Sequence, residues 1–350
     1  MSESEAGAEA EPETKKLTVT AIIEMFKKAL SKNDKAKCPS ESSLKTYAYS
    51  ILWLSKRMDF PADGSFPKPE QVMEYMENAK VSHMRRCSVY TALKKYHGCM
   101  DDGECAKYCT CLVRAKRAVD ANYMKQERTK RQEKNWIEFP VLKKFAYSLR
   151  DDVFKYDKNA FWSKVQFTKA QLAFILLFHL RYPIRRELST VQWDPKRTEW
   201  EKTDNYIDFK EHVVVLQKHK TSKYTGTHKL KLTRNLWRLW GLLKKQQNRR
   251  KIYKGHILLN KYYRPMSPSG FTTWLKNEMR LCEGCEKKGI SCMIIRHCCI
   301  THRRRHEMSL YQKRQFAHDC LHSEGRNELY RTPSAATKGS NTVVKDDGGS

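Results

Sequence analysis

A single arginine inside an apolar stretch is the feature that most constrains how this chain can fold. Met293 to Met308 reads MIIRHCCITHRRRHEM, so that Arg296 and His297 interrupt a run of isoleucines and cysteines. A buried arginine is costly unless it is paired or directed at an anion. The fold must therefore give Arg296 an acceptor or an anionic ligand.

The net charge is the first indication of a partner. The chain of 350 residues has 68 lysines and arginines against 39 acidic residues, a net charge of +29. The first thirteen residues hold five glutamates and no basic residue, which leaves +34 on the remainder. Such a charge favours a polyanionic partner, with nucleic acid as the leading candidate. The alternative is a solvated surface that only maintains solubility.

The apolar runs are too short for a membrane protein. The longest, Ala173 to Leu180, is well below the length that spans a bilayer. The acidic, polar N-terminus does not resemble a secretory signal. We therefore expect a soluble intracellular protein without a membrane partner.

Twelve cysteines could serve as thiols or as metal ligands in a reducing compartment. Two groups are close enough in sequence to consider, but neither has the spacing of a standard zinc module. A structural zinc is the alternative, and ordinary thiols with no bound metal are the expectation. The two groups are Cys99, Cys105, Cys109 and Cys111, and Cys282, Cys285 and Cys292.

The first third of the chain has a helical pattern. Residues 1–15 are expected to form a disordered acidic tail. Residues 16–125 are expected to form an all-helical domain, with one helix beginning behind a Ser43 cap and others over Glu70 to Met76 and Ser88 to Tyr96. The apolar positions that support the first of these helices are Leu44, Tyr47, Ala48, Ile51 and Leu54.

A strongly basic segment follows, from Arg114 to Trp136, and its part over residues 126–138 is interpreted as a linker. It has eight basic residues against three acidic ones and neither glycine nor proline. An exposed charged helix and a strip along a DNA backbone are both compatible with this pattern, and we favour the second. The candidate DNA-binding residues are Arg114, Lys116, Arg117, Arg128, Lys130, Arg131 and Lys134, together with Arg303 and Arg304 of the three-arginine run.

The rest of the chain, residues 139–331, has a mixed pattern. Helices are expected over 140–150 and 168–180. A further amphipathic helix is expected to carry Leu236, Leu239, Trp240 and Leu243 on one face. The β-branched run HVVVLQ, the turn SKYTG and the alternating Lys229 to Leu232 predict a β-hairpin. The sequence thus predicts a mainly helical fold with a small antiparallel sheet. Residues 332–350 are expected to form a flexible tail.

Five residues form an ordered series in this second domain. They are Arg185 in RYPIRREL, Lys220 in HKTSK, Arg296 in IIRHCCITH, His322 in CLHSEG and Tyr330 in NELYRT. Each alone has an ordinary structural explanation. In this order they resemble the tyrosine recombinase (phage integrase) family, including members from eukaryotic viruses and mobile elements.

The resemblance extends over most of residues 17–331. It implies a helical core-binding domain followed by a catalytic domain, which together clamp double-stranded DNA. It also implies four protomers acting on two duplexes, in the nucleus or at a site of viral replication. The segments that carry it are RRELSTVQWD, VVVLQKHKTSKYTGTHKLKL, ILLNKYYRPMSPSGFTTWLKN, RQFAHDCLHSEGRNELY and, in the first domain, SSLKTYAYSILWL.

The resemblance assigns a role to each of the five residues. Arg185 and Arg296 are expected to hold the two non-bridging oxygens of one DNA phosphate with their planar guanidinium groups. Tyr330 is expected to attack phosphorus, with Lys220 protonating the leaving oxygen and His322 contacting the phosphate or positioning the tyrosine. The phosphotyrosine conserves the energy of the phosphodiester, so no cofactor is expected.

Two positions depart from the family pattern. The family has His-x-x-Arg in its second motif, whereas Met293 stands three residues before Arg296. The first arginine is Arg185 by its Pro-x-Arg context, with Arg186 as the runner-up. Two other functions stay open on sequence grounds: a type IB topoisomerase, and a DNA-binding protein that has lost catalysis.

Overall fold

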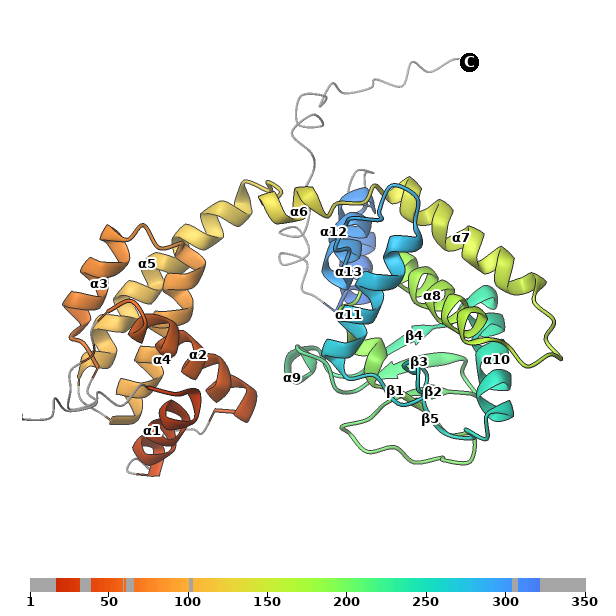
Figure 1. The fold of residues 1–350 in the computed structure, drawn as a ribbon, viewed down its shortest axis with the longest axis horizontal. Helices are drawn as coiled ribbons and strands as arrows, with labels where there is room; N and C mark the ends of the chain where they lie inside the picture. Colours follow the sequence, from red (N-terminus) through yellow and green to blue (C-terminus); the bar gives the residue numbers. More distant parts are fainter. Residues whose placement is uncertain are drawn as a thin grey trace, which may run out of the picture. The chain divides into compact units, whose positions relative to one another are not determined.

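The structure is a computed structural model that describes residues 17–31, 39–58, 60, 66–100 and 103–303, and 308–321, without the side chains of residues 99 and 100. Both predicted tails lie outside these residues. The chain divides into two compact units after Lys125 (Figure 1). Each unit has its own hydrophobic core.

The first unit is helical, as predicted. It consists of α1 (Val19–Ser31), α2 (Glu41–Ser55), α3 (Pro69–Asn78), α4 (His83–Met100) and α5 (Glu104–Met124). The cap of α2 differs from the prediction, because the Ser40 hydroxyl accepts the backbone N–H of Ser43, 3.3 Å away. Helix α2 therefore begins at Glu41, three residues before the position expected behind a Ser43 cap. A serine N-cap commonly accepts the backbone N–H of the third helical residue, as Ser40 does here.

The segment predicted as a linker lies in the second unit. It contains a short helix, α6 (Lys130–Lys134), whose first turn is closed by a capping box between Thr129 and Gln132. Trp136 and Ile137 are buried in the core of the second unit. The Trp136 carbonyl also accepts a hydrogen bond from Nζ of Lys288 at 2.9 Å. This part of the segment is therefore held in place by the second unit.

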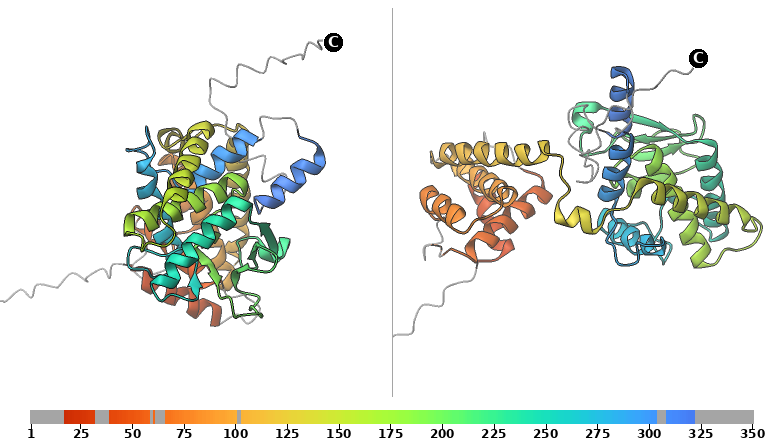
Figure 2. Two further views of the ribbon diagram at one scale, coloured as in Figure 1. Left: turned by 90° about the vertical axis from the view of Figure 1, so that its right-hand side faces the viewer. Right: turned by 90° about the horizontal axis from the view of Figure 1, so that it is seen from above.

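Helix α8 (Lys164–Arg181) is the centre of the second unit. It starts with a capping box between Ser163 and Gln166, and residues 170–179 are all buried. The apolar residues of α8 lie in the hydrophobic core. Three other helices contact α8, namely α7 (Phe139–Lys155), α10 (Arg234–Arg249) and α12 (Cys292–Arg303) (Figures 1 and 2). The other helices described are η1 (Glu187–Thr190), α9 (Ser222–Thr225), α11 (Pro268–Glu278), η2 (Met279–Leu281) and α13 (Leu310–Asp319).

A sheet of five strands, in the order β4-β3-β2-β1-β5, completes the second unit. The predicted hairpin is confirmed as β3–β4, with Val213 opposite Lys231 and Leu216 opposite His228. The sheet is mixed rather than purely antiparallel, because β1 and β2 pair in parallel. Residues 194–204 carry the chain back between them. The strands are β1 (Val191–Trp193), β2 (Asn205–Asp208), β3 (Val213–Leu216), β4 (His228–Lys231) and β5 (Gly255–His256).

The helices of the described residues do not include one that combines the length and the apolar character required to cross a bilayer.

Three histidines connect β4 to α13. The ring of His228, buried on β4, lies 5.0 Å from the ring of His219 and 4.2 Å from that of His318 on α13, measured between centroids. Burial, followed by the neighbouring His318 and His219, lowers the pKa of His228 to about 4. The ring is therefore neutral at pH 7, and it packs as an uncharged aromatic group.

This packing predicts an acid-sensitive contact. An unfolded histidine takes up its proton near pH 6.5, whereas folded His228 resists protonation until about pH 4. The native state is therefore destabilised as the pH falls from 6.5 towards 4. Relative to His228→Leu, the wild-type free energy of unfolding should fall over this range by up to about 3 kcal/mol.

Urea unfolding of the full chain at several pH values between 7 and 4 measures this difference. The exposed His83, on the other unit, provides a control: His83→Gln should follow the wild-type pH dependence. Parallel curves for wild type and His228→Leu would show that His228 is not the acid-sensitive group.

Candidate active site

Arg296 is buried on α12 and is held by two backbone carbonyl groups. Its side chain has no exposed surface. Nη1 donates to the Pro183 carbonyl at 2.5 Å, and Nη2 donates to the Cys320 carbonyl at 2.6 Å. The sequence predicted that a buried Arg296 needs hydrogen-bond acceptors. Two of them are main-chain oxygens from segments far apart in the chain.

The first of these segments carries Arg185. It leaves α8 at Tyr182, whose hydroxyl donates to the Lys231 carbonyl at 2.9 Å. His179, fully buried near the end of α8, has Nε2 at 3.2 Å from the Arg185 carbonyl and Nδ1 at 2.8 Å from the Ile175 carbonyl. Burial is the main cause that lowers the pKa of His179. The Arg185 carbonyl therefore lies against the buried His179 of α8, while the Arg185 side chain is half-buried and that of Arg186 is exposed.

Lys220 lies on the turn between β3 and β4, immediately before α9. Its side chain is exposed. The next residue, Thr221, reaches a distant part of the chain, because its hydroxyl donates to the Leu321 carbonyl at 3.2 Å. The lysine turn is therefore joined to the end of α13.

The end of α13 is where the two other segments meet. Cys320 accepts from Arg296, and Leu321 accepts from Thr221. Leu321 has a φ of 54°, in the left-handed region, and its side chain is buried in the core. Bulky residues rarely adopt this conformation, so the surrounding packing must hold it. His322 follows directly, but His322 and Tyr330 lie outside the described residues.

The structure thus joins the segments of three predicted site residues. The Arg185 loop and the Lys220 turn are connected to α12 and the end of α13 by hydrogen bonds through Arg296 and Thr221. Sequence reasoning had not singled out Thr221 or His179. Their polar side chains next to Lys220 and near Arg185 were the available signal.

The second motif has a thioether where the family has an imidazole. Met293 lies on the first turn of α12 and is 36% exposed. The neighbouring His297 has Nε2 at 3.4 Å from Nε2 of Gln132, in the segment predicted as a linker. This contact connects α6 to the helix that carries Arg296.

Among the predicted DNA-binding residues, Arg128 occupies an interior position. Its side chain is only 4% exposed and pairs with Glu133 at 3.3 Å and Glu138 at 3.6 Å. The guanidinium carbon also lies 3.7 Å from the centroid of the Trp136 ring. These contacts assign Arg128 a structural role. The remaining members of the segment are exposed: Arg114, Lys116 and Arg117 on α5, and Lys130, Arg131 and Lys134 on α6.

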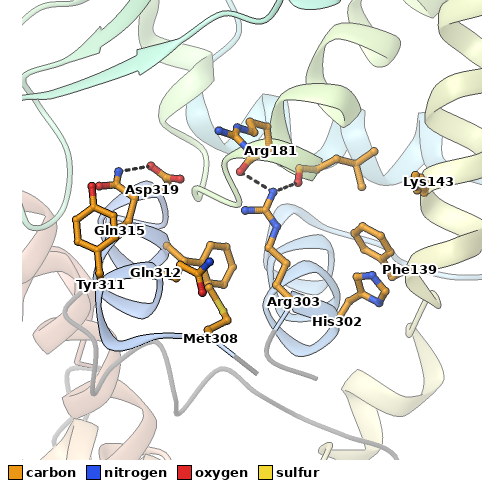
Figure 3. Close-up of a pocket in the computed structure, with 12 residues that line it drawn as sticks. Phe139, Lys143, Arg181, His302, Arg303, Met308, Tyr311, Gln312, Gln315 and Asp319 are labelled. Atoms are coloured by element: carbon orange, nitrogen blue, oxygen red, sulfur yellow. Dashed lines mark hydrogen bonds between the residues drawn. The ribbon is translucent and has the colours of Figure 1, made fainter. Parts of the chain in front are cut away.

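Arg303, another of the candidate DNA-binding residues, is hydrogen-bonded to the backbone at the end of α8. Its Nη2 donates to the Leu180 carbonyl at 2.6 Å and to the Arg181 carbonyl at 3.0 Å, and thereby caps the end of α8 (Figure 3). The centroid of the Phe316 ring on α13 lies 4.8 Å from the guanidinium carbon of Arg303. Both residues line a pocket of about 550 Å³. Burial lowers the pKa of Arg303. Arg304 lies outside the described residues.

Among the described residues, no group of three or more histidine, cysteine or acidic side chains is arranged to hold a metal ion. Cys282, Cys285 and Cys292 are buried thiols, and burial raises the pKa of Cys282 and of Cys292 to about 12.

Comparison with known proteins identifies the fold. No protein-family model and no curated protein matches the sequence. The structure resembles the Tn1549 transposon integrase, solved in complex with transposon right-end DNA, with a TM-score of 0.53 and 13% identity, covering 91% of this chain and 96% of that chain.

Two further solved structures are similar over most of their length but with lower scores. XerA recombinase has a TM-score of 0.39 and 10% identity, covering 92% of this chain and 96% of that chain. Protelomerase TelA, covalently complexed with substrate DNA, has a TM-score of 0.40 and 14% identity, covering 93% and 98%. The integrase match confirms the predicted fold: a helical first unit followed by a mainly helical second unit with a small sheet.

Proposed function

We propose that this protein is a site-specific DNA recombinase or integrase that cuts and rejoins DNA through a covalent phosphotyrosine. One observation carries the proposal. The loop of Arg185, the turn of Lys220 and the helix of Arg296 are hydrogen-bonded into one assembly around Cys320 and Leu321. These are the two residues that precede His322, and Tyr330 follows eight positions later.

The chemistry follows from the charges in this assembly. A phosphodiester bound there lies beside the positive charges of Arg185 and Arg296, which stabilise the charge that develops on the non-bridging oxygens. The Tyr330 hydroxyl loses its proton to solvent, and its oxygen forms a bond to phosphorus as the bond to the leaving DNA oxygen breaks. Lys220 donates a proton to that oxygen, and His322 contacts the phosphate or orients the tyrosine.

The reverse reaction joins the strands. An incoming DNA hydroxyl attacks the phosphotyrosine and returns its proton to Lys220. The bond between phosphorus and the tyrosine oxygen breaks, and the tyrosine recovers its proton from solvent. Because the phosphodiester bond energy is retained in the protein–DNA linkage, the cycle needs no nucleotide cofactor. The proposed partners are double-stranded DNA and further copies of this chain, four protomers acting on two duplexes.

Exposed Met293 supports one competing function. A thioether cannot exchange protons, so a chain lacking the family's imidazole is also compatible with a DNA-binding protein without catalysis. The two functions differ in whether a covalent protein–DNA adduct forms on a nicked suicide duplex. That assay is therefore the primary test of the proposal.

We predict that Tyr330→Phe abolishes this adduct and leaves the affinity for duplex DNA near that of wild type, because only a hydroxyl is lost. Tyr311→Phe is the matched control, since Tyr311 lies on α13 and is 76% exposed. It should retain the adduct. Loss of the adduct in Tyr311→Phe, with retention in Tyr330→Phe, would reverse the assignment. Wild type that binds DNA without forming an adduct would support the non-catalytic function.

The exposed cations of α6 provide a test of the DNA path. Lys130→Ala combined with Arg131→Ala should weaken binding to all duplexes alike and flatten the dependence of log affinity on log salt by about two units. Lys254→Ala combined with Lys261→Ala, which removes two exposed charges near β5, should leave that slope unchanged. Equal slopes for wild type and the α6 variant would show that α6 is a solvated face.

The division of roles between lysine and arginine predicts a chemical rescue. Lys220→Ala should slow cleavage by about a hundredfold, the usual scale for losing a general acid. A bridging phosphorothiolate leaves as a thiolate, whose conjugate acid has a pKa of about 8.5, and therefore needs no proton donor. This substrate should restore cleavage by Lys220→Ala but not by Arg185→Ala or Arg296→Ala. Rescue of the arginine variants would show that they act in proton delivery.

A further inference from the structure

The turn that carries Lys220 is anchored on both sides of the lysine. On one side, the buried Asn205 of β2 binds both backbone groups of Lys218: Oδ1 accepts its N–H at 2.9 Å and Nδ2 donates to its carbonyl at 2.9 Å. On the other side, the Thr221 hydroxyl donates to the Leu321 carbonyl at 3.2 Å. The first anchor fixes the turn to the sheet, and the second fixes it to the end of α13.

The Thr221 hydroxyl is well suited to hold this second anchor. A carbonyl oxygen can only accept, so the hydroxyl proton points to Leu321. The hydroxyl oxygen also lies 3.2 Å from Nδ1 of His219, whose Nε2 is 2.9 Å from the Gly226 carbonyl at the far end of the turn. The hydroxyl of Thr221 therefore joins the turn to the end of α13. Its branched Cβ restricts the rotamer that this contact requires.

The acceptor is equally fixed. Leu321 is buried, takes the left-handed conformation and donates its N–H to the His318 carbonyl at 2.9 Å. The preceding carbonyl, that of Cys320, is held by Arg296. A rigid carbonyl is a more effective anchor than a mobile one, because little conformational entropy is lost when the turn binds to it.

We propose that Thr221 is a positioning residue, which places Lys220 as the proton donor only when the end of α13 is docked in the site. The inference rests on the proposed function. Lys220 has a long flexible stem and an exposed side chain, so the backbone of its turn decides where the ammonium group can reach. His322 and Tyr330 follow Leu321 in the chain. The bond from Thr221 to Leu321 therefore couples the position of the segment that leads to Tyr330 to the position of the proton donor, Lys220.

The chain offers closely matched variants. Thr221→Val removes the donor and keeps the shape, whereas Thr221→Ser keeps the donor. Thr225→Val is the control, because Thr225 lies on the same short helix and its hydroxyl bonds only to the nearby Thr221 carbonyl among the contacts described, at 3.2 Å. Thermal unfolding and duplex affinity, measured for every variant, identify any loss of folding or binding.

The main test compares cleavage of oxygen-bridged and sulfur-bridged suicide duplexes. Thr221→Val should cleave the oxygen substrate about three- to tenfold more slowly, the range expected for one lost hydrogen bond, and should cleave the sulfur substrate at the wild-type rate. Thr221→Ser and Thr225→Val should match wild type on both. Unchanged oxygen cleavage by Thr221→Val would overturn the inference, and so would equal slowing on both substrates, which indicates a role other than proton donation.

A double-mutant cycle provides a second criterion. If Thr221 acts through Lys220, then Thr221→Val should cause no further loss of oxygen cleavage in the Lys220→Ala background. Multiplied losses would mean that Thr221 acts independently of the lysine, which contradicts the proposal.

Hydrogen exchange separates this inference from the proposed function. Thr221→Val should increase amide exchange in residues 218–226 of the DNA-free protein, and Thr225→Val should not. A wild type that never forms an adduct would refute the proposed function, and the exchange result would then still decide whether Thr221 holds the turn. Unchanged exchange in Thr221→Val would refute the anchor itself.

Discussion

The organisation of the second unit depends on how a fully buried guanidinium is satisfied. Arg296 has no contact with solvent, and its desolvation must be offset by strong acceptors. Two of them are the carbonyls of Pro183 and Cys320. The same two bonds bring the loop of Arg185 and the end of α13 to one point. The arginine that we propose as a ligand of the DNA phosphate is thus also the residue that joins these two segments.

Local patterns predicted the helices and the hairpin, because apolar spacing and turn residues act over a few positions. The helical first unit and the β3–β4 pairing followed from such patterns. The parallel pairing of β1 with β2 did not, because it depends on where residues 194–204 return the chain. Two predicted DNA ligands were placed differently for a similar reason. The acceptors of Arg128 and Arg303, such as Glu138 and the Leu180 carbonyl, are chosen by the fold.

The candidate site was predictable in its residue types and only partly in its geometry. The order Arg185, Lys220, Arg296 was visible as a resemblance, and the structure connects the segments that carry these residues. The connecting groups are backbone carbonyls and the Thr221 hydroxyl, which carry no distinctive sequence signal. In a site of this kind a few side chains supply the charge, and hydrogen bonds to main-chain groups set the geometry. Preorganised donors are effective because they need little rearrangement when charge develops.

The most direct test of the account is to identify the residue that becomes linked to DNA. The wild-type protein is incubated with a nicked suicide duplex, the adduct is digested with protease and nuclease, and the peptide that carries the nucleotide remnant is sequenced by mass spectrometry. The account predicts a remnant on Tyr330 and on no other tyrosine. A remnant on Tyr311, or DNA binding without any adduct, would contradict it.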